Sequence, residues 1–183
     1  YSSAASDVYK RQVLRAFQEY GMRVLGVEPA RNIAERAVAD GIPTVAEFFH
    51  LATARAIHEA DGPAKLIIAR HVLAHVAELH SFVEGVAHCL ATDGVAVFEV
   101  PHLLPFFEKL EYDTVYHEHL CYWSVGVLQK LGMMHGLQLI NVEEVAIHGG
   151  SVLVTFQRSD GPFAVEPSVG LMIAKEDAIG LRK

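Results

Sequence analysis

The sequence is poor in cysteine and has no long apolar run. Of its 183 residues, only Cys89 and Cys121 are cysteines. Their spacing predicts neither a disulfide framework nor a cysteine zinc site. The longest apolar runs, such as Val95–Val100, are too short to cross a bilayer. Nothing resembles a secretion signal, so we expect a cytoplasmic protein with no membrane partner.

Positive charge is also scarce. The chain has 15 Lys and Arg against 22 Asp and Glu, which gives a formal net charge of −7. A non-specific nucleic-acid binder needs a basic face to neutralise phosphates, so we expect no nucleic-acid partner. Hydrophobic residues make up 51% of the chain, enough to bury a sizeable core, and disorder is not expected.

Both ends of the sequence look cut. Tyr1–Gln12 (YSSAASDVYKRQ) resembles translated adapter sequence, and clear helical patterning begins only at Val13. The last residue, Lys183, falls inside a helical pattern that starts at Val169. We therefore expect an artefactual or disordered tail over 1–12, a partial domain over 13–158 and the start of a C-terminal domain over 159–183.

Short apolar runs of strand length alternate with helical segments in the first half of the chain. The expected strands are Arg23–Val27, Ile42–Val45, Lys65–Ala69 and Val95–Val100. The expected helices between them are Ala30–Ala39, Glu47–Ala60 and Leu79–Leu90. This alternation predicts an α/β fold with a doubly wound, mostly parallel sheet.

The pattern changes after a helix expected over Val125–His135. Leu137–Ile147 and Val152–Gln157 are separated only by His148-Gly149-Gly150 and the residue that follows. So short a link forces the two strands to pair antiparallel. A parallel sheet that closes with an antiparallel hairpin is typical of class I methyltransferase (Rossmann-like) sheets and separates them from ordinary dinucleotide-binding domains.

Cofactor contacts are expected where strands end, because ligands of doubly wound sheets lie beyond the carboxyl ends of the strands. Glu28, followed by Pro29, ends the first strand, and its carboxylate could accept hydrogen bonds from both hydroxyls of an adenosine ribose. A solvated carboxylate near a helix N-terminus is an equally open interpretation. The residues that follow the second and third strands complete the predicted cofactor set: Ala46, Glu47, Phe48, Ala69 and Arg70.

A cluster of ionisable side chains lies in Tyr116-His117-Glu118-His119, beyond the Val95–Val100 strand. An imidazole titrates near neutrality and can remove a proton, a carboxylate can stabilise its charged form, and a phenol can donate to an oxyanion. His75 follows the third strand on the same rim, and His148 precedes the glycine turn. Function is favoured over a structural role for this cluster.

Metal binding is the weaker interpretation of the histidines. His71 and His75 are four residues apart and His117 and His119 alternate, yet no known zinc pattern is present, so no metal is predicted. The helical histidines are expected to be ordinary hydrogen-bonding residues: His58, His80, His88 and His135.

Several blocks resemble the C-methyltransferases of deoxysugar biosynthesis. They are VLGVEPARNIAERA (Val24–Ala37), GIPTVAEFF (Gly41–Phe49), VLAHVAELHSFVEGV (Val72–Val86), VAVFEVPHL (Val95–Leu103), EKLEYDTVYHEHLCYWSV (Glu108–Val125) and IHGGS (Ile147–Ser151). The resemblance implies an S-adenosylmethionine-dependent enzyme that methylates carbon 3 of a dTDP-linked 4-keto-6-deoxysugar. A base removes the acidified C–H proton, and the enolate carbon takes the methyl group.

The resemblance also implies residue roles. His119 would be the base and Glu118 its partner, Tyr116 and His75 would support the enolate oxygen, and Glu28 would hold the cofactor ribose. Zinc would belong only to a cysteine-rich N-terminal domain that is missing here, as is the glycine loop expected before Val13. We therefore expect this fragment to be inactive.

Three positions depart from the family pattern. Arg70 and His71 stand where two asparagines are expected, and Leu153 stands where the family tends to have arginine. The remaining alternatives are a class I methyltransferase with another small-molecule acceptor, an NAD-dependent nucleotide-sugar enzyme, and a non-catalytic binding module.

Overall fold

A computed structural model describes residues 4–110, 114–146 and 149–181. The chain divides into two compact units, one up to Phe49 and one from His50 onward. Each unit is described by itself.

The first unit contains two helices and a small parallel sheet. Its elements are α1 (Ala4–Glu19), β1 (Gly26–Val27), α2 (Arg31–Ala39) and β2 (Thr44–Val45). β1 and β2 pair in parallel with Val27 opposite Val45, as the βαβ pattern predicts. Ala34, Ala37 and Ile42 are the buried apolar residues of this unit.

Helix α1 begins nine residues before the expected start at Val13. The residues in question include alanine, lysine, arginine and glutamine, which favour helix, so the boundary expected after Gln12 falls inside a helix. The described residues from Ala4 onward lie in this helix, and the expectation of an artefactual or disordered tail over 1–12 stays a prediction.

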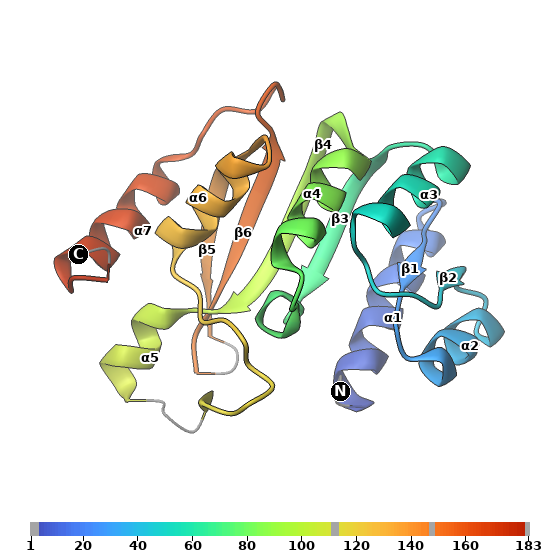
Figure 1. The fold of residues 1–183 in the computed structure, drawn as a ribbon, viewed down its shortest axis with the longest axis horizontal. Coiled ribbons are helices and arrows are strands. Elements are labelled where there is room, and N and C mark those ends of the chain that lie inside the picture. The colour runs from blue at the N-terminus through green and yellow to red at the C-terminus, as the bar shows by residue number, and fades with distance from the viewer. Residues whose placement is uncertain (1–3, 111–113, 147–148, 182–183) are drawn as a thin grey trace. The chain divides into compact units, whose positions relative to one another are not determined.

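The second unit carries the larger sheet. Its elements are α3 (Leu51–Asp61), β3 (Ala64–Arg70), the 3-10 turn η1 (Leu73–His75), α4 (Leu79–Cys89), β4 (Leu90–Pro101), α5 (Leu103–Lys109), α6 (Val125–Met134), β5 (Leu137–Val145), β6 (Ser151–Arg158) and α7 (Pro167–Ala178). The four strands lie in the order β3-β4-β6-β5, with β3 parallel to β4 and β6 antiparallel to both of its neighbours (Figure 1). The predicted hairpin, here β5 and β6, is confirmed.

The described residues form two separate sheets, whereas the sequence predicted one. Among them β3 pairs only with β4, so its other edge is free. Leu66 and Ile68 on this strand are 40% and 38% exposed. Parallel strands are normally covered on both faces, so β3 has the sequence of an interior strand in the position of an edge strand.

β4 is twice as long as expected, because it continues through Asp93-Gly94, where a turn was predicted. A side chain at position 94 would place its Cβ 2.7 Å from the Ala64 carbonyl oxygen of β3. Glycine is therefore required by close strand packing rather than by a turn.

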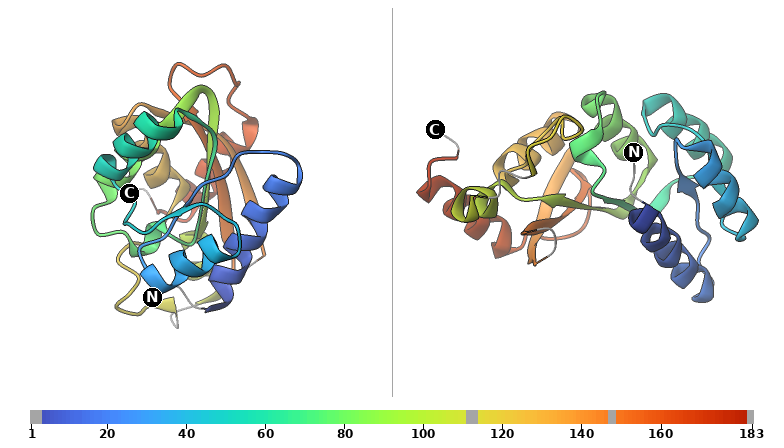
Figure 2. Two further views of the ribbon diagram at one scale, coloured as in Figure 1. Left: turned by 90° about the vertical axis from the view of Figure 1, so that its right-hand side faces the viewer. Right: turned by 90° about the horizontal axis from the view of Figure 1, so that it is seen from below.

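The core lies between this sheet and its helices. α4 and α6 lie on one face of the sheet, as the views in Figures 1 and 2 agree. Phe98 of β4 and Phe156 of β6 are buried, with ring centroids 5.5 Å apart. Helix α7, expected to open a C-terminal domain, packs against β5, and Ser168 Oγ donates to Asn141 on that strand over 2.7 Å. No helix within the described ranges is long and apolar enough to span a membrane.

Candidate functional site

In the first unit, the carboxyl ends of β1 and β2 bring two groups of predicted cofactor residues together. Glu28 follows β1 and Ala46 follows β2, which are paired at Val27 and Val45. Glu28 is half-buried, and its Oε1 accepts a hydrogen bond from the Ala30 N–H at 2.9 Å. Phe48 is 70% exposed. Pro29 and Glu47 are exposed at the same end.

In the second unit, Ala69 and Arg70 end β3, also as predicted. Arg70 lies opposite Glu99 of β4, and its Nε donates to Glu99 Oε2. His71 Nε2 lies 2.9 Å from Glu99 Oε1, and the His71 N–H donates to the Glu99 carbonyl. His71 has a positive φ of 51°, a backbone conformation that is strained for a residue with a side chain.

Glu99 is a site residue that sequence reasoning missed. Its side chain is buried, and burial alone would raise its pKa. The hydrogen bond and charge of Arg70, together with His71, more than offset this and hold the pKa of Glu99 below its usual value. A lone glutamate within the apolar run VAVFEV was the signal that could have revealed it.

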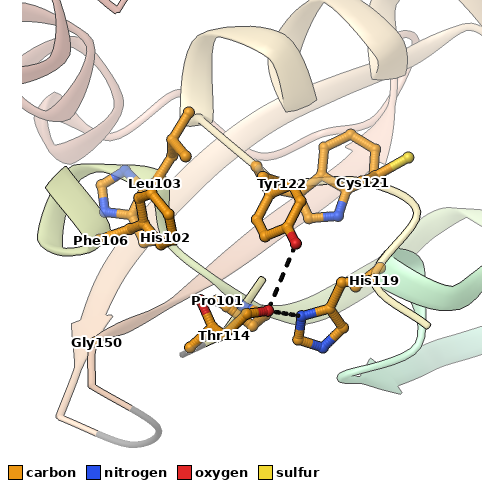
Figure 3. A pocket seen from close by; sticks show the side chains of 11 residues that line it. Pro101, His102, Leu103, Phe106, Thr114, His119, Cys121, Tyr122 and Gly150 are labelled. Carbon is orange, nitrogen blue, oxygen red and sulfur yellow. Dashed lines mark hydrogen bonds between the residues drawn. The ribbon is translucent and has the colours of Figure 1, made fainter. Parts of the chain in front are cut away.

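The segment after residue 113 places Tyr116 against His119. The Tyr116 hydroxyl lies 2.7 Å from His119 Nε2, and His119 Nδ1 lies 2.9 Å from the Thr114 carbonyl oxygen. A carbonyl can only accept, so Nδ1 carries the proton and Nε2 presents its lone pair to the phenol. Figure 3 shows the Thr114 carbonyl between His119 and Tyr122.

Glu118 was expected to be the partner of His119, but its side chain makes no hydrogen bond to the His119 ring among the described contacts. Its backbone carbonyl instead lies 2.8 Å from His75 Nδ1. The His75 ring is 5.0 Å from that of His119, and the Ala74 carbonyl accepts from the Leu120 N–H at 2.7 Å. The turn η1 and residues 118–121 are thus held together, which brings His75, Glu118 and His119 close to one another.

Burial and nearby charges shift the pKa values of His119 and Tyr116. Burial lowers the pKa of His119, reinforced by nearby His75, while the Thr114 carbonyl and the charge of Glu118 act in the opposite direction. Glu118 therefore acts on His119 through its charge. Burial raises the pKa of Tyr116, and Glu118 adds to this rise. The lowered pKa of His119 favours a neutral imidazole, and the raised pKa of Tyr116 favours a protonated phenol.

A small cavity of about 20 Å³ lies beside His119. The side chains that line it include His102, Phe106, Tyr122 and Trp123 (Figure 3). His102 and Trp123 were not singled out from the sequence. Both are buried, and they are joined by a bridge between the end of β4 and the segment that leads to α6.

The other histidines divide into structural pairs. His80 Nδ1 and His135 Nε2 lie 2.8 Å apart, and the rings of His58 and His88 are 5.0 Å apart. The contact between His80 and His135 agrees with the expected hydrogen-bonding role, whereas His58 Nδ1 is buried with no hydrogen-bond partner among the described residues. The described parts of the chain contain no group of three or more His, Cys, Asp or Glu side chains placed to hold a metal ion. His148, expected before the glycine turn, lies outside the described residues.

Solved structures with similar folds support the architecture. A SAM-dependent methyltransferase from Anabaena variabilis matches with a TM-score of 0.57 at 14% identity, over 74% of this chain and 68% of that protein. The 1,6-didemethyltoxoflavin-N1-methyltransferase from Burkholderia thailandensis, whose structure contains S-adenosylhomocysteine, matches with a TM-score of 0.53 at 17% identity, over 79% and 64%. The predicted class I methyltransferase fold is confirmed.

Sequence comparison extends this result. C-methyltransferase NovU from Streptomyces niveus is 36% identical over 168 residues, which cover 92% of this chain. The chain spans 40% of the length of NovU. The family model described as a methyltransferase domain matches residues 9–142, most of the sequence. The chain therefore belongs to the methyltransferase-domain family.

Proposed function

We propose that this chain is part of an S-adenosylmethionine-dependent C-methyltransferase that acts on carbon 3 of a dTDP-linked 4-keto-6-deoxysugar. The observation that carries the proposal is the arrangement of His119, whose Nδ1–H is fixed by the Thr114 carbonyl and whose Nε2 faces the Tyr116 hydroxyl. The similarity to a protein named as a C-methyltransferase supports transfer to carbon.

His119 has the properties that removal of a proton from a ketone-activated carbon requires. Its lowered pKa keeps Nε2 unprotonated at neutral pH, and its tautomer is already set by Thr114. Tyr116, 44% exposed, can leave Nε2 and donate to the ketone oxygen as negative charge develops there. His75, exposed beside His119, is placed to line the same substrate.

The residues at the strand ends fit a nucleoside. Glu28 uses one carboxylate oxygen to accept from Ala30, and a carboxylate has further lone pairs for ribose hydroxyls. The exposed ring of Phe48 suits stacking against an adenine. S-adenosylmethionine would supply the methyl group. We propose Glu28, Pro29, Ala46, Glu47 and Phe48 for the nucleoside, with Ala69 and Arg70 near the sulfonium end.

We further propose that a strand outside this sequence pairs with β3 and carries the glycine loop of the cofactor site. The free edge of β3 and the exposed side chains of Leu66 and Ile68 support this. An interior parallel strand gains both backbone hydrogen bonds and apolar cover when a neighbour is added.

The test is calorimetric titration of S-adenosylhomocysteine into this chain and into a version with a family-like strand and glycine loop ahead of Val13. Far-ultraviolet circular dichroism first establishes that both are folded. Binding by the extended version alone, with heat abolished by Glu28→Ala, is the expected result. If neither folded protein binds, the proposed cofactor is wrong.

The acceptor is tested separately. The extended enzyme should methylate a dTDP-linked 4-keto-6-deoxyhexose. In deuterium oxide without cofactor, mass spectrometry should show that the unmethylated sugar exchanges its carbon 3 proton for deuterium. Methylation on oxygen or nitrogen, or of an unrelated acceptor, would support the alternative of another small-molecule methyltransferase.

A further inference from the structure

His102 and Glu176 form a buried pair outside the group of proposed catalytic residues. The side chains are 2% and 0% exposed, and His102 Nε2 lies 2.8 Å from Glu176 Oε1. The Glu176 carboxylate also accepts from the backbone N–H groups of Val125 and Gly126, the first residues of α6. The first N–H groups of a helix have no partner within the helix, and negative charge is favourable there. One side chain of α7 therefore ties the end of β4 to the start of α6.

The two places that Glu176 joins lie next to Trp123. The Trp123 carbonyl accepts from the Leu103 N–H at 2.8 Å, and an isolated bridge pairs Trp123 with His102. On the other side, Val125 follows Trp123 by two residues and donates to Glu176. The backbone at Trp123 is thus held both by the residues at the end of β4 and by the start of α6, and the same carboxylate contacts both.

Tyr122 connects this held position to His119. Its ring meets the His119 ring edge to face, with centroids 6.0 Å apart, and its hydroxyl lies 3.5 Å from the Thr114 carbonyl oxygen. The same carbonyl oxygen lies 2.9 Å from His119 Nδ1. A displacement of Trp123 moves the adjacent Tyr122, and with it two of the groups that surround His119.

His102 is not placed to act on a substrate directly. In Figure 3 its nitrogens lie on the side away from His119, and Nε2 contacts Glu176. Glu176 itself is fully buried on α7. Both residues can therefore affect His119 only through the segment that leads from His119 to α6.

We propose that Glu176 is a positioning residue: by holding His102 and the first residues of α6, it fixes the segment that presents His119 and Tyr116. The two oxygens of the carboxylate accept three hydrogen bonds at once. A glutamine amide of the same size has one acceptor oxygen and an NH₂ group that only donates, so it cannot replace the carboxylate at three donors. The inference rests on the proposed function for the role of His119, but the position of the His119 ring can be measured without methyl transfer.

The test is nuclear magnetic resonance of the chain as it stands. In the parent, ring ¹⁵N shifts of His119 should place the proton on Nδ1, and the rings of Tyr116 and His119, 4.0 Å apart, should show a nuclear Overhauser effect. In Glu176→Gln this effect should weaken and the His119 ring should show a mixture of tautomers. His58 and His88, on α3 and α4, are the internal reference and should not change. His119 signals identical to those of the parent would overturn the proposal.

A matched variant separates positioning from a general loss of stability. Gly132→Ala also alters α6, because the added Cβ would lie 2.5 Å from Phe156 Cε1, but it does not touch Glu176. At a temperature where circular dichroism shows both variants to be folded, Gly132→Ala should leave the His119 signals unchanged. Equal changes in the two variants would assign the effect to stability and contradict a positioning role.

If Glu176→Gln does not fold, hydrogen exchange of the unaltered chain decides. The N–H groups of Val125 and Gly126 are at a helix start, where such groups exchange fast unless a partner outside the helix holds them. Exchange as slow as in the interior of α6 supports the proposal. Fast exchange at both positions would mean that Glu176 does not hold the start of α6, and the proposal fails.

Kinetics of the extended enzyme distinguish this inference from the proposed function. Glu176→Gln should lower kcat by up to about a hundred-fold, because a misplacement of about 1 Å has that effect. The KM for the sugar and the affinity for S-adenosylhomocysteine should change little. If the His119 ring moves in this variant and kcat does not fall, the positioning of His119 is supported and its role as the base is contradicted.

Discussion

The hydroxyl of Tyr116 lies 2.7 Å from Nε2 of His119, three residues further along the chain. This short contact makes the phenol the immediate partner of the imidazole lone pair. In the proposed reaction, a substrate that approaches His119 displaces the phenol, and the displaced hydroxyl then lies close to the group from which the proton is taken. The proposed base and the proposed hydrogen-bond donor thus belong to one segment.

Replacement of His119 by asparagine in the extended enzyme should slow methyl transfer by about a hundred- to ten-thousand-fold, because general-base catalysis contributes that much. S-adenosylhomocysteine affinity should stay unchanged, since His119 is not among the proposed cofactor residues. Steady-state kinetics and calorimetry on the same preparation measure both. His117→Asn, an exposed neighbour, serves as the control. Activity of His119→Asn within a few fold of the parent would remove His119 from the role of base.

The charge of Glu118 raises the pKa of His119 against the larger effect of burial. Glu118→Gln should therefore lower the pKa of His119 further, because the protonated imidazole loses a favourable neighbour. An NMR titration of the His119 ring measures the midpoint, with Glu84→Gln on α4 as control. An unchanged or higher midpoint would show that Glu118 does not act on His119.

The same shift predicts the pH dependence of the extended enzyme. In the proposed mechanism His119 must be unprotonated to act, so the rate should rise with pH to a plateau, with its midpoint below about pH 6.5, the usual histidine pKa. Because the pKa of His119 is lowered by folding, this side chain binds a proton more readily in the unfolded chain than in the folded one. The contribution of His119 to stability is thus present above about pH 6.5 and decreases as pH falls towards its folded pKa. Rate profiles and urea unfolding at several pH values test the two statements.

Glu176→Gln should lower the free energy of unfolding at pH 7 by about 1–3 kcal/mol, because a buried charged acceptor loses strength at three hydrogen bonds. Burial alone would raise the pKa of Glu176, but His102 and the N–H groups of Gly126 and Val125 hold it below its usual value. The stability from this lowered pKa is present above the unfolded pKa and is lost as pH falls through the folded pKa. The difference between variant and parent should therefore narrow in acid. A constant difference in urea melts would contradict this account.

Two helical glycines make a matched pair for packing. A Cβ at Gly132 on α6 would come within 2.5 Å of Phe156 Cε1, whereas a Cβ at Gly170 on α7 would meet nothing within 4 Å. Gly132→Ala should cost about 1–3 kcal/mol through overpacking. Gly170→Ala should stabilise the chain by up to about 1 kcal/mol, because alanine favours helix. Chemical unfolding of both variants checks the signs, and equal effects would show that Phe156 can move aside.

The amino-acid sequence alone predicted several helices and the hairpin, because the local residue pattern determines these elements. Apolar periodicity predicted α2, α4 and α6, and the short link at Gly149-Gly150 predicted the antiparallel pairing of β5 and β6. The sequence did not predict how far each strand extends, because that depends on which strands pair. Arg23–Val27 has strand character throughout, yet only Gly26–Val27 is a strand, since strand extent depends on a partner with which to form hydrogen bonds.

The residues of the candidate site also differ in how far the sequence alone could indicate them. Tyr116, Glu118 and His119 are adjacent in sequence, so clustering alone indicated them. His102 and Glu176 are 74 residues apart, and Arg70 and Glu99 are 29 apart, so only the fold brings each pair together. The partners of His119 could not be predicted either, because a backbone carbonyl such as that of Thr114 leaves no mark in side-chain patterns.

The edge position of β3 has a consequence for how this chain behaves in solution. Among the described residues β3 pairs with β4 alone, and an edge strand with exposed leucine and isoleucine is a template for pairing with an extended segment of another molecule, including the same strand. Concentrated solutions of the chain should consequently form assemblies through Ala64–Arg70, and Leu66→Lys should keep the molecules apart. Light scattering during purification will register the difference before any assay is run.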